Sequence, residues 1–90
     1  MKRYVIERDL PGVGQLTDQQ LKEAAAKSNG ALAKLAGKAQ WVQSFVAQDR
    51  TFCLYLAEDE AAIHEHARLS GFPANRVTEL VGALDPTTAG

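Results

Sequence analysis

The chemistry that this chain could perform centres on a thiol, a phenol and a hydroxyl that two neighbouring strand patterns bring together. Residues 41–48 and 51–56 are rich in β-branched and aromatic residues, and the polar pair Asp49-Arg50 separates them, which predicts a β-hairpin. Alternation then divides the hairpin into two faces. One face, expected to be the core face, collects Trp41, Gln43, Phe45, Ala47, Phe52, Leu54 and Leu56. The other is apolar with polar groups set into it, and collects Val42, Ser44, Val46, Cys53, Tyr55 and Ala57.

Each polar group of this mixed face has two possible roles, one structural and one functional. A lone buried cysteine such as Cys53 usually behaves as a small hydrophobic residue, and its alternative role is a thiolate that binds a metal or takes part in redox chemistry. Ser44 and Tyr55 stand opposite each other in the expected register, so their hydroxyls satisfy each other or orient a small ligand. Cys53 is therefore a candidate metal ligand, and Ser44 and Tyr55 are candidate ligand-binding residues.

Glu7 is the acidic candidate. It alternates onto one side of the first strand pattern, which neighbours the second hairpin strand in the usual strand order, so we expect it near Cys53 or Tyr55. A carboxylate on a half-buried face must be paired, protonated or bound to a cation. Glu7 is thus either a salt-bridge or hydrogen-bond partner, or a metal ligand or general base.

The two histidines do not form a pair. His64 and His66 are two residues apart, which places them on different sides of a helix, so they cannot hold one ion together. His64 stands four residues from Glu60, on an outer face where such pairs are common. His66 shares the inward stripe of its helix and is either a buried, hydrogen-bonded histidine or a ligand. The candidate metal ligands are Glu7, Cys53 and His66.

The elements that must position these residues follow from periodicity, caps and breakers. Thr17 and Gln20 form a capping box at the start of the first helical pattern, and Gly71 with Pro73 ends the second. The resulting order is β-α-β-β-α-β, which predicts an α+β ferredoxin-like fold with a four-stranded antiparallel sheet. Both helices then cover one sheet face and leave the other open for dimerisation.

We expect a single domain over residues 1–84 and a flexible tail over residues 85–90. Strand patterns cover residues 2–10, 41–48, 51–56 and 76–83, and helical patterns run from Thr17 to Gly37 and from Asp59 to Gly71.

Composition narrows the class of protein. The chain has 90 residues, 46% hydrophobic and 23% charged, with a net charge of −1, so it lacks the basic footprint that nucleic-acid binding needs. The basic residues Lys2 and Arg3 are not followed by a long apolar stretch of the kind found in signal peptides and membrane anchors. We therefore expect a cytoplasmic location and no membrane partner. The single cysteine cannot form an internal disulfide. Phosphate-binding glycine loops, Ser-His-Asp signatures and closed zinc motifs are missing.

Several segments together resemble a known family. They are Tyr4 to Gly12, Trp41 to Val46, Phe52 to Tyr55, Ala57 to Ala61, His66-Ala67 and Gly71 to Ala74. The family is a set of small bacterial ferredoxin-like proteins of unknown function, some of which are described as nickel-binding, and the resemblance spans roughly residues 4–84. It implies a homodimer built through the sheets and the binding of a transition metal, with nickel first, but it does not identify the ligands.

The residues and the family resemblance together predict a small homodimeric protein that binds nickel or a similar divalent ion on or near the open sheet face. Borderline metals of this kind accept imidazole, thiolate and carboxylate together. The alternative is a dimeric enzyme of the monooxygenase or isomerase type, which would enclose a cavity between its sheets and use Glu7 as base and Tyr55 as donor. A structural or regulatory dimer without a ligand is the third reading. The sequence does not decide whether the chain is an enzyme.

Overall fold

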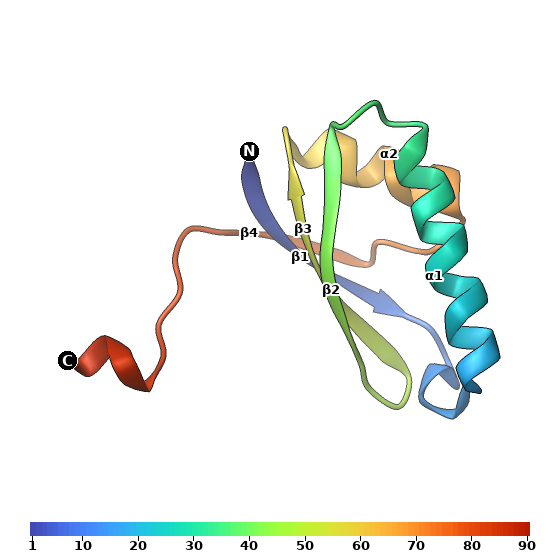
Figure 1. Ribbon diagram of the computed structural model, residues 1–90, viewed down its shortest axis with the longest axis horizontal. Coiled ribbons are helices and arrows are strands. Elements are labelled where there is room, and N and C mark those ends of the chain that lie inside the picture. The colour runs from blue at the N-terminus through green and yellow to red at the C-terminus, as the bar shows by residue number, and fades with distance from the viewer.

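The chain folds as one four-stranded antiparallel sheet with both helices on one side of it (Figure 1). The computed structural model describes all residues from Met1 to Gly90. The strand order is β2-β3-β1-β4, which confirms the predicted ferredoxin-like βαββαβ fold. The elements are β1 (Lys2–Asp9), η1 (Val13–Gln15), α1 (Asp18–Ala33), β2 (Ala39–Val46), β3 (Arg50–Ala57), α2 (Glu60–Ser70), β4 (Arg76–Leu80) and η2 (Pro86–Ala89).

The helix starts are set by local side-chain bonds. The backbone N–H of Gln20 donates to Thr17 Oγ1 at 3.2 Å and the backbone N–H of Thr17 donates to Gln20 Oε1 at 2.9 Å, so the predicted capping box is confirmed. At α2, Asp59 accepts from the backbone N–H of Ala62 at 3.0 Å. Gly71 ends this helix at φ 79°, a left-handed conformation that glycine adopts without steric cost.

The hairpin turn lies one residue earlier than the sequence indicated. The backbone N–H of Ala47 donates to Arg50 O at 2.8 Å, so Gln48 and Asp49 occupy the turn instead of Asp49 and Arg50. The register is also interrupted between Trp41 and Gln43, where one extra residue interrupts the ladder in β2.

The shifted turn and the bulge change which residues of β2 and β3 lie opposite each other. Trp41 pairs with Tyr55 and moves to its side of the sheet, whereas Ser44 pairs with Cys53. The expected opposition of Ser44 and Tyr55 is wrong, because the earlier turn shifts the register of the hairpin and places Ser44 opposite Cys53.

The predicted assignment of the two sheet faces is also wrong. Cys53 and Tyr55, expected on the open face, are 5% and 2% exposed and belong to the core under the helices. Phe45 and Phe52, expected in the core, are 57% and 37% exposed on the open face. Both faces of the hairpin are apolar, and alternation separates two sets of side chains without saying which set the helices will cover.

The core that results lies between the sheet and the two helices. Its most buried members include Ile6 of β1 and Ile63 of α2, at 0% and 1% exposed.

Strand β4 ends at Leu80 and not at Ala83 as predicted, and the chain beyond it runs away from the sheet in Figure 1. The predicted division into a domain and a flexible tail stays a prediction. Neither helix combines the length and apolar character that crossing a bilayer requires.

Ile63→Ala tests the position of the core. The substitution leaves a cavity at a fully buried position, so we expect it to lower the free energy of unfolding by about 2–5 kcal/mol in urea denaturation. The matched control is His64→Ala on the outer face of the same helix, which we expect to stay within about 0.5 kcal/mol of the wild type. Similar losses for both variants would contradict the placement of α2.

Candidate functional site

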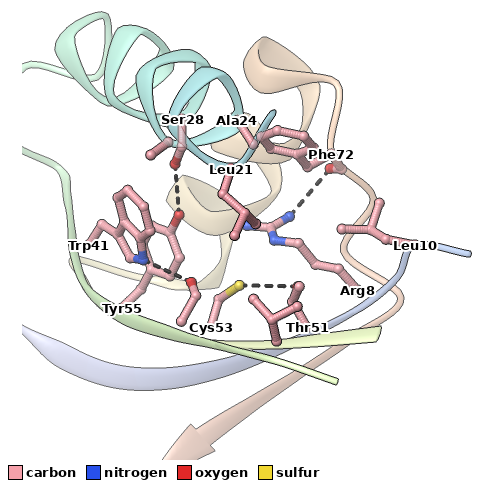
Figure 2. Close-up of a pocket in the computed structure, with 13 residues that line it drawn as sticks. Arg8, Leu10, Leu21, Ala24, Ser28, Trp41, Thr51, Cys53, Tyr55 and Phe72 are labelled. Carbon is pink, nitrogen blue, oxygen red and sulfur yellow. Dashed lines mark hydrogen bonds between the residues drawn. The ribbon is translucent and has the colours of Figure 1, made fainter. Parts of the chain in front are cut away.

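A pocket of about 240 Å³ lies between α1 and the helix-covered face of the sheet (Figure 2). It exists because both of its walls carry small side chains, which do not fill the space between the layers. Thirteen residues line it, and nine of them are hydrophobic. The small residues are Ala24, Ala25 and Ser28 on α1 and Ser44, Thr51 and Cys53 on the sheet. This pocket lies inside one chain, whereas the cavity between the two sheets of a dimer that the sequence suggested stays a prediction.

A buried histidine lies behind this pocket and joins its polar groups. His66 of α2 is 1% exposed, and the Nη2 group of Arg8 donates to its Nδ1 at 3.5 Å. A guanidinium only donates, so Nδ1 must be the acceptor and Nε2 must carry the proton. The Nε2–H group faces Ser28 Oγ at 3.2 Å and Ser28 O at 3.4 Å. His66 is therefore a neutral, fully bonded histidine.

This tautomer decides against nucleophilic catalysis by Ser28. A serine nucleophile needs a base that can accept its proton. The nitrogen of His66 that faces Ser28 Oγ already carries a proton, and a guanidinium holds the other nitrogen where a catalytic triad would place a carboxylate. The Ser28–His66 contact is thus a structural hydrogen bond.

Tyr55 completes the hydrogen-bonded network. Its hydroxyl lies 3.1 Å from Ser28 Oγ, and its ring centroid lies 5.1 Å from that of His66. Burial raises the pKa of the Tyr55 phenol above its usual value, although the bond to Ser28 acts in the opposite direction. The phenol therefore stays protonated and acts as a hydrogen-bond partner at the pocket wall.

Arg8 is the only charged residue that lines the pocket, and it is 3% exposed. Its Nη1 group donates to Pro73 O at 2.9 Å and to Phe72 O at 3.3 Å. None of the ion pairs in the structure includes Arg8. Its charge faces carbonyl dipoles, a neutral imidazole, the pocket and the ring of Tyr55, whose centroid lies 5.9 Å from Arg8 Cζ. Figure 2 shows its side chain reaching from β1 towards Phe72, below α1.

The structure places the predicted site residues in two separate groups. Cys53, Tyr55 and Ser44 line the pocket, and His66 lies behind it. Glu7 lies on the opposite, open face, because it pairs with Phe52 and not with Cys53 in the β1–β3 register. The expectation that Glu7 lies beside Cys53 or Tyr55 is wrong.

The surroundings of Glu7 are those of an ion-paired residue. Its carboxylate lies 3.5 Å from Arg50 Nη1 and 3.7 Å from Arg76 Nε. The salt-bridge alternative considered from the sequence is therefore the one observed.

Residues 4–80 match the family described as SCO4226-like, a nickel responsive protein. The chain belongs to this family. The resemblance seen in the sequence is thereby confirmed over most of the chain. The structure is also similar to the crystal structure of SCO4226 from Streptomyces coelicolor A3(2), with a TM-score of 0.73 over 91% of this chain and 99% of that one. The two sequences are 17% identical, so this similarity shows a shared fold. No curated protein matches the chain.

The candidate metal ligands of this SCO4226-like chain do not form a closed metal site. No group of three His, Cys, Asp or Glu side chains lies close enough to hold an ion. Both nitrogens of His66 are in hydrogen bonds and a guanidinium lies beside the ring, which opposes a second cation there. The one histidine in contact with a carboxylate is His64, whose Nε2 lies 3.2 Å from Glu60 Oε2 on the outer face of α2.

Two residues that line the pocket and bond to His66 were not singled out from the sequence. Arg8 alternates with Tyr4 and Ile6 on the first strand, so a charge in a buried register was visible there. Ser28 follows the inward stripe of α1, where a hydroxyl is an exception among apolar residues. Their contact with His66 depends on the packing of α2, which the sequence pattern does not describe.

The environment of His66 predicts a pH-dependent stability. Burial, with the charge of Arg8 as a second cause, holds the pKa of His66 below its usual value of 6.5. As the pH falls through about 6.5, the unfolded chain takes up a proton that the folded chain does not, so the free energy of unfolding falls as well. We expect the wild type to lose more stability between about pH 7 and about pH 5 than His66→Gln, measured by urea denaturation.

Glutamine is the suitable replacement because its amide both accepts and donates hydrogen bonds but does not titrate. The exposed carboxylates are common to both proteins, so the difference between the two pH profiles isolates the histidine. Parallel profiles for the two proteins would contradict a depressed pKa at His66.

Proposed function

We propose that this protein is a homodimer that binds nickel or a similar divalent ion. Membership of a family described as nickel responsive supports nickel as the ion. The observation that carries the site is the contact between His64 and Glu60 on the outer face of α2, at 3.2 Å. Imidazole and carboxylate are donors that borderline divalent ions accept.

The pair suits metal binding better than the other candidates do. His64 and Glu60 stand four residues apart, so both side chains leave the helix from one face. Their side chains are 54% and 58% exposed, which leaves them accessible to an ion from solution. Two protein donors are an incomplete coordination shell, so water or a second chain would supply the remaining ligands.

The homodimer is supported by the open face of the sheet. Phe45 and Phe52 pair across β2 and β3 and are 57% and 37% exposed, and no element of the chain covers them. Monomeric proteins rarely expose a large contiguous apolar surface. The half-buried side chains beside them on this face are Val5, Leu54 and Leu56.

A second copy of the chain is the occupant that this face fits. In a two-fold interface the same patch packs against itself, so an apolar centre meets an apolar centre. Charged residues stand at one end of the patch, where Arg50 lies 3.0 Å from Asp9 and 3.5 Å from Glu7. An apolar centre with a polar rim is the usual anatomy of a protein interface.

Nickel titration of the metal-free protein tests the proposed ligands. We expect His64→Ala to weaken nickel binding by at least about tenfold, because it removes the imidazole donor. Cys53→Ala is the control, since this thiol is buried in the core, and we expect it to leave the affinity unchanged. Calorimetry gives both affinities.

Two outcomes would count against the proposal. Weaker binding in Cys53→Ala with no change in His64→Ala would place the metal at the thiol. Failure of the wild type to bind nickel would overturn the metal-binding function itself.

The dimer is tested by placing a charge at the centre of the open face. We expect sedimentation of the wild type to give twice the mass of one 9.7 kDa chain, and Phe45→Glu to give the mass of one chain. Burying an unpaired carboxylate at an apolar interface is strongly unfavourable, which is the reason for the expected dissociation. The control is Gln19→Glu on exposed α1, which should remain dimeric. A monomeric wild type, or a dimeric Phe45→Glu variant, would refute this interface.

A further inference from the structure

We propose that the pocket beneath α1 binds a small organic monocarboxylate with an apolar body, and that the guanidinium of Arg8 holds the carboxylate. This site is separate from the outer face of α2 and from the open face of the sheet. The proposal stands on the bonding of Arg8, on the chemistry of the pocket walls and on the size of the pocket.

The guanidinium presents a free edge to the pocket. Its Nη1 group is occupied by Phe72 O and Pro73 O, whereas Nη2 makes one long contact, to His66 Nδ1 at 3.5 Å. The Nε–H group of Arg8 has no partner in the protein. No fully buried side-chain nitrogen or oxygen lacks a hydrogen-bond partner, so Nε must reach open space, and the pocket is the space that Arg8 lines.

The charge of Arg8 has no counterion inside the protein. The carbonyls of Phe72 and Pro73 follow the end of α2 and contribute partial negative charge only. The exposed residues Arg50, Arg68 and Arg76 each pair with a carboxylate, whereas the buried arginine does not. A buried charge is strongly stabilised by an ion of opposite sign, and a carboxylate matches the geometry of a guanidinium edge.

The rest of the pocket favours an apolar ligand body with one anionic group. Arg8 is the only charged residue on its walls, so a second carboxylate or a phosphate of higher charge would lack a partner. Leu21 and Phe72 add apolar and aromatic surface near the guanidinium (Figure 2). The hydroxyls of Ser28 and Tyr55 already bond to each other at 3.1 Å, which leaves Arg8 as the main polar anchor.

The volume of the pocket limits the ligand to a few carbon atoms or one ring. About 240 Å³ is below the usual range of roughly 300–1,000 Å³ for drug-sized ligands. A dry cavity of about 150 Å³ accommodates benzene. Benzoate and hexanoate are therefore suitable probes for an aromatic and an aliphatic body.

Binding of the two probes is compared with binding of benzamide, which has the shape of benzoate without its charge. We expect benzoate or hexanoate to bind with an affinity at least about tenfold above that of benzamide, about 1.4 kcal/mol, because the amide cannot neutralise the guanidinium. Calorimetry measures the affinities, and ligand-induced NMR shifts at the Trp41 indole N–H, on the pocket wall, show the location.

Two variants separate the pocket from its charge. Ala25→Leu fills the space between α1 and the sheet and keeps Arg8, so we expect it to remain folded and to lose carboxylate binding. Arg8→Lys keeps the positive charge but lacks the planar donor edge, so we expect weaker binding of both carboxylates. His64→Ala should bind benzoate as the wild type does.

The proposal is overturned if neither carboxylate binds to the wild type, or if benzamide binds as well as benzoate. It is also overturned if folded Ala25→Leu keeps the affinity of the wild type, because the ligand would then lie elsewhere. Folding of each variant is checked by circular dichroism. If Arg8→Lys is unfolded, Ala25→Leu and the comparison of benzoate with benzamide still decide the outcome.

Discussion

The guanidinium of Arg8 lies inside the protein, and the elements around it are arranged to accommodate its charge. Removal of an arginine from water is costly unless polar groups replace its hydration. Here β1 supplies the arginine, the segment that follows α2 supplies the carbonyls of Phe72 and Pro73, and α2 supplies the Nδ1 acceptor of His66. His66 in turn bonds to Ser28 of α1, and Ser28 bonds to Tyr55 of β3. One chain of hydrogen bonds therefore connects both helices to both central strands.

This network also explains why a pocket remains under α1. The helix is held at Ser28 by hydrogen bonds, and Ala24 and Ala25 are too small to reach the sheet in the preceding turn. The sheet offers small side chains at the same place, namely Ser44, Thr51 and Cys53. The hollow therefore follows from the small residues at these positions.

The two faces of the sheet have different roles as a result. The covered face contains the polar network and the pocket, and the open face contains exposed aromatic side chains with an ion-paired edge. Their separation divides the metal ligands that the sequence predicted, because Glu7 lies on one side of the sheet and Cys53 and His66 lie on the other. The sheet itself prevents a single chain from bringing these three side chains to one ion.

Local signals in the sequence determined the order of elements, the start of α1 and both ends of α2, whereas α1 ends at Ala33 instead of at Gly37 and β2 and β4 end earlier than their patterns indicated. The capping box at Thr17, the cap at Asp59 and the glycine at position 71 act within a few residues of the backbone groups that they satisfy, so no tertiary information was needed. The fold class followed from that order. The tertiary structure alone decided which face the helices cover, because both hairpin faces are apolar and alternation treats them equally. It also decided the contacts of Arg8 with Phe72 and Pro73, which lie 64 and 65 residues away in the chain. These hydrogen bonds depend on how α2 and the segment after it pack against β1. No local sequence pattern encodes a contact between residues so far apart in the chain.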